Sequence, residues 1–162
     1  RDGVTVPAPT PPPADPPAAP PTSVAPLVRR HLAFGWWSLA AFTALGLALE
    51  AMHGLKLGWY LDVSAGTRRL AFTLGHAHGS LLGLVHIAFA LSARELALGP
   101  VALARVSFAL RAASVLLPLG FVIGGLTTYG GDPGLGIALV PPAGALLVIA
   151  LGVIARDLTR RR

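Results

Sequence analysis

The sequence contains no cysteine, and it carries little charge for a chain of 162 residues. The missing thiols exclude disulfide bonds, thiolate metal sites and iron–sulfur clusters held by this chain. Charged residues make up 12% of the sequence and apolar residues 54%, whereas soluble domains average about 25% and about 45–50%. The apolar residues gather in long runs, which are typical of membrane-spanning helices rather than of a large soluble core.

The common catalytic signatures are absent as well. The chain has no Gly-x-Ser-x-Gly nucleophile elbow, no His-Glu-x-x-His metal motif and no Walker phosphate loop. The glycine-rich run at 130–134 contains Asp132 and Pro133 and is a turn signal, because no strand–helix unit surrounds it. No motif therefore predicts an enzyme.

Residues 1–26 contain ten prolines and no periodic apolar pattern. Proline fixes φ and lacks the backbone N–H, so neither a helix nor a sheet is expected there. We predict a disordered, semi-extended tail over 1–26, followed by a membrane domain over 27–162. The tail is not a signal peptide, because it has no apolar core.

Four apolar segments follow the tail, at about 31–53, 70–92, 100–128 and 135–155. Each contains about 20 or more residues, which as a helix reach the roughly 30 Å of a bilayer core. The segments predict an all-α fold, a four-transmembrane-helix antiparallel bundle in contact with lipid. Pro141 and Pro142 leave open whether the fourth helix begins before or at Pro141.

Basic residues are distributed unequally between the two sides of this predicted bundle. One side holds Arg29, Arg30, Arg94, Arg105, Arg111, Arg156, Arg160, Arg161 and Arg162, and the other holds Lys56, Arg68 and Arg69. The positive-inside rule then places both termini in the cytoplasm. Because the charges sit at helix ends, topology explains the net charge of +6 better than nucleic-acid binding does. Arginine in place of lysine is typical of GC-rich bacterial genomes, so we predict a multi-pass protein of a bacterial inner (cytoplasmic) membrane.

Small and polar residues form one stripe on each of the first three predicted helices. The second has Gly75, Gly79, Gly83 and His86 on one face, the third Ser107, Arg111, Ser114, Pro118 and Gly125, and the first Thr43, Gly46, Glu50 and His53. Small residues let helix backbones approach closely in lipid. The stripes are therefore predicted to face inward, or to dock a membrane-protein partner or a second copy. The fourth helix has a weaker stripe and is expected at the periphery.

Ionisable side chains within a membrane are costly and therefore mark candidate functional sites. The candidates are Glu50, His53, His76, His78 and the deeper His86. Glu50, His53, His76 and His78 are predicted to meet in the outer leaflet, with Glu50 in direct or one-water reach of an imidazole. His31 follows Arg30 and is expected at the cytoplasmic interface.

Four interpretations of these residues stay open. His53 with His76 or His78 supplies two axial ligands for haem b. Imidazoles and a carboxylate also suit Zn²⁺ or Cu²⁺, although His76 and His78 point about 200° apart on a helix. Histidine titrates near neutral pH, which suits proton handling. The residues can also serve only to hydrogen-bond across helices and fix their packing.

Two resemblances add to this reading. The run Gly75–Gly83, with its His-x-His, resembles a helix of small membrane proteins related to the haem–copper oxidase catalytic subunit; this implies His76 or His78 as a haem ligand. The third and fourth spans hold no histidine, so a binuclear haem–copper centre on this chain is excluded. The runs 52–62 and 129–136 resemble an uncharacterised family of small bacterial membrane proteins, which implies no activity.

Three functional hypotheses follow from the sequence. The leading one is a haem-binding or electron-transfer accessory subunit. The second is a structural or assembly protein that docks a partner through its glycine face. The third is a solute or proton conduit formed by oligomers.

Overall fold

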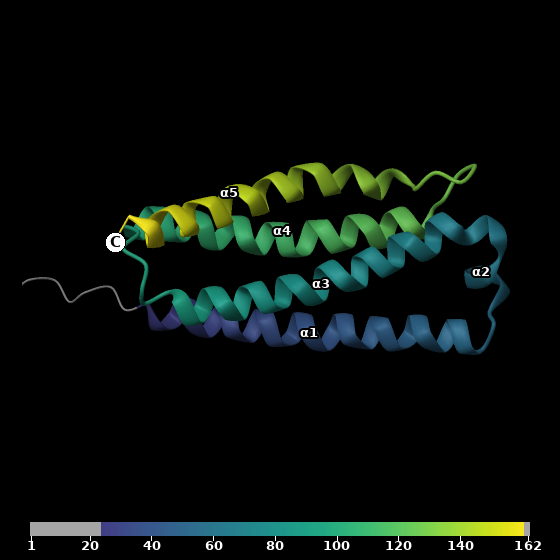
Figure 1. Cartoon of the computed structure of the whole chain (residues 1–162), viewed down its shortest axis with the longest axis horizontal. Helices are drawn as coiled ribbons and strands as arrows, with labels where there is room; N and C mark the ends of the chain where they lie inside the picture. The colour runs from purple at the N-terminus through teal and green to yellow at the C-terminus, as the bar shows by residue number, and fades with distance from the viewer. Residues whose placement is uncertain (1–23, 161–162) are drawn as a thin grey trace, which may run out of the picture.

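Four long helices run back and forth along one axis (Figure 1). A computed structural model describes the chain from Val24 to Arg160, and the long helices are α1 (Ala25–Gly54), α3 (Gly66–Ser92), α4 (Pro100–Leu126) and α5 (Val140–Thr159). A 3₁₀ helix, η2 (Leu135–Leu139), leads into α5. All four are long and apolar enough to cross a membrane. The predicted all-α, four-transmembrane-helix fold is confirmed, and the chain is a multi-pass membrane protein.

Proline sets three of the helix starts. Pro26, Pro100 and Pro141 lie in the first turns of α1, α4 and α5, where the missing N–H interrupts no helical hydrogen bond. The first helix therefore begins at Ala25 rather than at His31, and the last two residues of the predicted tail are helical. The rest of that prediction, residues 1–23, lies outside the described part of the chain. The fourth α-helix begins at Val140, next to Pro141, which answers the question that the sequence left open.

The connection between the first two spans is more ordered than the sequence predicts. It contains a short helix, α2 (Gly58–Leu61), and a 3₁₀ turn, η1 (Val63–Ala65), and α3 begins at Gly66 rather than at 70. Arg68 holds this connection against the end of α4: its Nε donates to the Gly125 carbonyl at 3.3 Å, and its guanidinium lies 4.5 Å from the centre of the Trp59 ring.

The glycine-rich run after α4 forms a two-residue turn. Tyr129 and Asp132 exchange backbone hydrogen bonds of 2.9 and 3.0 Å, and Gly130 and Gly131 have φ of 57° and 94° between them. Positive φ at both central positions is the geometry that glycine adopts without steric cost. The turn prediction is confirmed.

The long helices pack in chain order, α1 against α3, α3 against α4 and α4 against α5 (Figure 1). The backbones of α1 and α4 do not contact each other. The α5 helix is peripheral, as predicted, and a Cβ added at Gly144 or Gly152 on it would meet open space.

The glycine face of α3 is used inside the bundle. A Cβ at Gly75 would lie 2.8 Å from Val122 of α4, one at Gly79 would overlap the Phe42 ring of α1, and one at Gly83 would lie 3.0 Å from the Gly35 carbonyl. The inward-facing interpretation of this stripe is confirmed. In this structure, α1 and α4 cover the face that the sequence offered as a docking surface.

The bundle has two distinct ends (Figure 1). We call the end that holds the start of α1, the 93–99 connection, the start of α4 and the end of α5 the basic end, since Arg29, Arg94, Arg105, Arg156 and Arg160 lie on these segments. The opposite end holds α2 and the 127–139 connection. At the basic end, the Asp157 carboxylate accepts a 2.8 Å hydrogen bond from the Ala97 amide and ties α5 to the 93–99 connection.

Candidate functional site

The predicted outer-leaflet cluster is only partly assembled. Glu50 and His53, near the end of α1, are both exposed, and within residues 24–160 no hydrogen bond or ion pair reaches the Glu50 carboxylate. Glu50 and His76 line one shallow groove of about 290 Å³ together with Thr43 and Thr73. The structure therefore brings Glu50 near one of the three predicted histidines, without a direct bond.

His76 and His78 face different helices, as their 200° separation requires. The His76 Nδ1–H donates to the Phe42 carbonyl of α1 at 2.6 Å, and its ring lies against Gly46. The His78 Nδ1–H donates to the Leu74 carbonyl of its own helix at 2.8 Å, and its ring packs at 5.1 Å from the Phe121 ring of α4.

This arrangement does not fit the predicted haem site. Two axial ligands must face one slot, but His53 is exposed at the end of α1 while His76 and His78 turn toward opposite neighbours. Between Val24 and Arg160, no group of three or more histidine, aspartate and glutamate side chains is placed to hold a metal ion.

The buried histidines lie elsewhere, toward the basic end. His31 of α1 and His86 of α3 are 1% and 0% exposed, and their Nδ1 atoms are 2.7 Å apart. The ring centroids are 4.8 Å apart and the ring planes differ by 20°, so the two rings meet edge to edge; Phe89 packs edge-on against His31, and Phe34 packs against His86. The sequence placed His31 at the cytoplasmic interface; the structure adds that its side chain is buried inside the bundle, because α1 begins at Ala25.

Serines of α4 extend this pair at both ends. The His31 Nε2 is 2.8 Å from the Ser107 hydroxyl, and the His86 Nε2 is 3.0 Å from the Ser114 hydroxyl. Ser107 and Ser114 are themselves 7% and 2% exposed. The result is an unbroken hydrogen-bonded chain, Ser107–His31–His86–Ser114, which we call the histidine chain. It links α1, α3 and α4, and it bridges α1 to α4 where their backbones do not meet.

The order of protons along the histidine chain is constrained by chemistry. A neutral imidazole carries one N–H and one bare nitrogen, so only one of the two facing Nδ1 atoms can hold the proton between them. If His31 donates from Nδ1, its Nε2 accepts from Ser107 and the His86 Nε2–H donates to Ser114. If His86 donates instead, every bond in the chain reverses. Moving each proton across its own bond converts one arrangement into the other when one proton enters at Ser107 and one leaves from Ser114.

Close helix contact holds the chain in place. One turn along α1 from His31, a Cβ at Gly35 would lie 2.7 Å from the Gly83 carbonyl of α3. On the next turn, the Ser38 hydroxyl donates to the Gly79 carbonyl at 3.0 Å. Small residues at 35, 79 and 83 thus bring α1 and α3 close enough for two imidazoles to share one hydrogen bond.

The two ends of the histidine chain lie in different surroundings. Arg111 of α4 is half-buried, and its Nε donates to the Ser107 carbonyl at 3.3 Å, so its side chain turns back toward the basic end. At the other end, Ser114 and Ser38 line a groove of about 310 Å³ between α1 and α4, whose remaining walls are apolar.

Sequence reasoning did not identify His31 as a buried site residue, and it did not select Ser38. On the first span it selected the stripe Thr43, Gly46, Glu50 and His53, whereas the structure buries His31, Gly35, Ser38 and Leu49. His31, Gly35 and Ser38 follow one another at spacings of four and three residues, which places them on one face of a helix. This spacing was the sequence signal that could have identified the buried face of α1. On α4 the predicted stripe is confirmed, since Ser107, Ser114, Pro118 and Gly125 are all buried.

No family of known proteins, no curated protein and no solved structure matches this chain.

Proposed function

We propose that this membrane protein conducts protons along the bundle interior, with the histidine chain as the proton-carrying element. The observation that supports this most directly is the unbroken series of hydrogen bonds from Ser107 to Ser114, at 2.8, 2.7 and 3.0 Å. Buried polar side chains within a membrane span are rare, and chains of them mark proton relays.

A proton moves through such a chain by exchange. A proton that reaches Ser107 displaces the Ser107 hydroxyl proton onto the His31 Nε2, the His31 Nδ1–H crosses to the His86 Nδ1, and the His86 Nε2–H passes to Ser114. Ser114 then releases its own hydroxyl proton into the groove that it lines. Charge is conserved at each step, because every group gains one proton and loses one. The chain then stands in the reversed arrangement and returns by rotation of the hydroxyl groups and imidazole tautomer exchange.

Access to the chain differs at its two ends. At the basic end, the Arg111 guanidinium requires water or lipid phosphate around it, which hydrates the approach to Ser107. Ser107 and Ser114 are seven residues apart on α4, so the chain covers roughly 10 Å of the membrane thickness. Beyond Ser114 the path opens into the groove that Ser38 also lines, between α1 and α4.

The histidine chain is complete within one copy of the protein, so this conduit does not need the oligomer that the sequence-based hypothesis invoked. The haem or electron-transfer hypothesis has less support, because the predicted ligands do not converge on one slot. We further propose the orientation that the arginines favour, with the basic end in the cytoplasm of a bacterial cell.

Proton flux into proteoliposomes tests the proposal. The purified protein is reconstituted with a pH-sensitive dye inside, and a potassium gradient with valinomycin drives proton uptake. We expect the wild-type protein to exceed empty vesicles, and His31→Leu and His86→Leu to fall to the level of empty vesicles. His78→Leu is the matched control, since His78 bonds only within its own helix, and it should keep wild-type flux.

Each variant is first checked for helix content and melting temperature in detergent, so that a loss of flux is not confused with a loss of folding. Wild-type flux equal to that of empty vesicles would contradict the proposal. So would a folded His86→Leu variant that conducts as well as wild type, because the histidine chain would then serve packing alone.

A further inference from the structure

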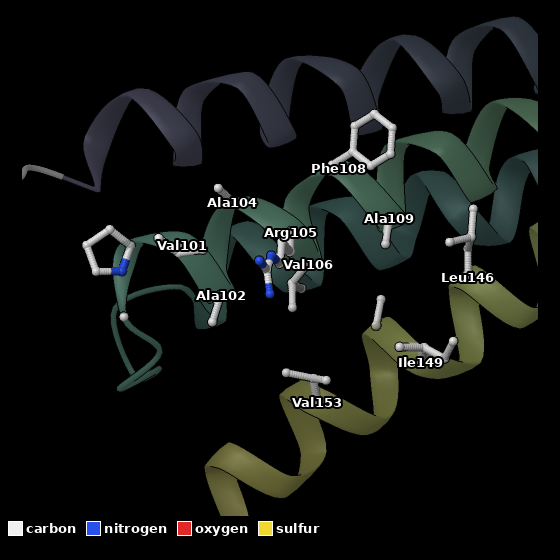
Figure 2. A pocket seen from close by; sticks show the side chains of 13 residues that line it. Val101, Ala102, Ala104, Arg105, Val106, Phe108, Ala109, Leu146, Ile149 and Val153 are labelled. Atoms are coloured by element: carbon white, nitrogen blue, oxygen red, sulfur yellow. The ribbon is translucent and has the colours of Figure 1, made fainter.

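A large apolar cleft opens between α4 and α5 at the basic end (Figure 2). It has a volume of about 1070 Å³ and runs along α4 from Gly99 to Ala109, roughly 15 Å of helix. Small side chains on α4 and Ala150 on α5 leave this space, and Val106, Ile149 and Val153 supply its apolar walls. The cleft is separate from the histidine chain, which lies between α1, α3 and α4.

Among residues 24–160, Arg105 is the only charged residue that lines the cleft. Figure 2 shows its side chain directed from α4 into the space between α4 and α5. Within residues 24–160 no carboxylate forms an ion pair with it. The acid nearest along α5, Asp157, already accepts from the Ala97 amide. An unpaired cation thus stands five residues after the start of α4. Because α4 has 27 residues, more than the roughly 20 that cross a bilayer core, we expect this position at the level of the lipid headgroups.

We propose that the cleft binds one anionic phospholipid, with its phosphate on Arg105 and an acyl chain along the walls formed by Val106, Ile149 and Val153. Both parts of the ligand follow from the site, since a cation at the headgroup level attracts anionic lipid and a slot open to the bilayer core accepts hydrocarbon. A helix of a second copy would instead cover the Arg105 guanidinium with apolar side chains, which leaves a cation without a partner in the membrane.

Lipid retention in mild detergent tests this site. The purified full chain is incubated with equal amounts of phosphatidylglycerol and phosphatidylcholine of the same acyl chains, and bound lipid is read by native mass spectrometry. We expect one phosphatidylglycerol retained in preference to phosphatidylcholine. Arg105→Gln should lower that preference by about fivefold, the factor for one cation at an anionic lipid surface.

Two further variants separate the site from general charge attraction. Arg94→Gln removes the same charge from an exposed position at the same end and should leave the preference unchanged. Ala102→Phe fills the cleft and should reduce retention of both lipids, with the melting temperature showing that the variant is folded. Equal retention of the two lipids by wild type, equal effects of Arg105→Gln and Arg94→Gln, or a crosslinked dimer that buries the cleft without lipid would each overturn the proposal.

Discussion

At the scale of single residues, two imidazoles that share one hydrogen bond form the centre of the proposed proton path. His31 and His86 are buried, and each has exactly two ring nitrogens, all four of which have partners among Ser107, Ser114 and each other. The only buried polar side-chain atom without a partner among the described residues is the Ser80 hydroxyl. A polar network whose members are all paired can persist in an apolar interior, whereas a half-paired one is destabilising.

Replacing one histidine should therefore lower the free energy of unfolding by more than the loss of that histidine's own hydrogen bonds. His31→Leu or His86→Leu leaves the partner Nδ1 without a hydrogen bond, which costs about 1–3 kcal/mol. The double variant removes both groups, so its loss of unfolding free energy should be smaller than the sum of the single losses by about 0.6–1.7 kcal/mol, the range of interhelical hydrogen bonds in membranes. Unfolding in detergent of the wild type, the two single variants and the double variant measures this difference. Additive losses would mean that the two imidazoles are not coupled.

At the scale of helices, close approach of α3 to its neighbours positions the histidine chain. Gly79→Leu should destabilise the bundle strongly, by about 2 kcal/mol or more, because any side chain there overlaps the Phe42 ring and overpacking of this kind costs about 1–3 kcal/mol. Leu81→Ala is the matched change on the lipid-facing side, where Leu81 is 58% exposed, and it should lower the melting temperature much less. Equal tolerance of the two changes would remove the glycine contact from the account.

The helices also show what sequence can and cannot predict. Long apolar runs and proline positions located all four spans, and the glycine spacing identified the face of α3. The start of α1 was misplaced because Arg29 and Arg30 suggested a membrane boundary, although basic side chains extend from a helix that has already begun. Because of that shift, His31 was placed at the membrane boundary and was not considered as a buried residue. Which histidines pair was not predictable, because it depends on the register between α1 and α3, and that register is set by Gly35 meeting Gly83.

At the scale of the whole molecule, both described chain ends lie at the basic end (Figure 1), and the predicted orientation places that end in the cytoplasm. The absence of cysteine makes a direct test simple. Ser64→Cys and Thr159→Cys place single thiols at exposed positions of the two ends. In intact cells a membrane-impermeant maleimide should label position 64 and leave position 159 unlabelled until the cells are lysed. Labelling of position 159 alone in intact cells would invert the topology.

Nitrogen-15 NMR of histidine-labelled protein in lipid bilayers at neutral pH reports whether His31 and His86 share a proton, with the five histidines assigned through His→Leu variants. The account predicts that His31 and His86 occupy opposite tautomers, one protonated at Nδ1 and the other at Nε2, with a coupling between their Nδ1 nuclei across the shared proton. Two rings in the same tautomer with no coupling would mean that no proton is shared, and the histidine chain would not exist as a path for protons.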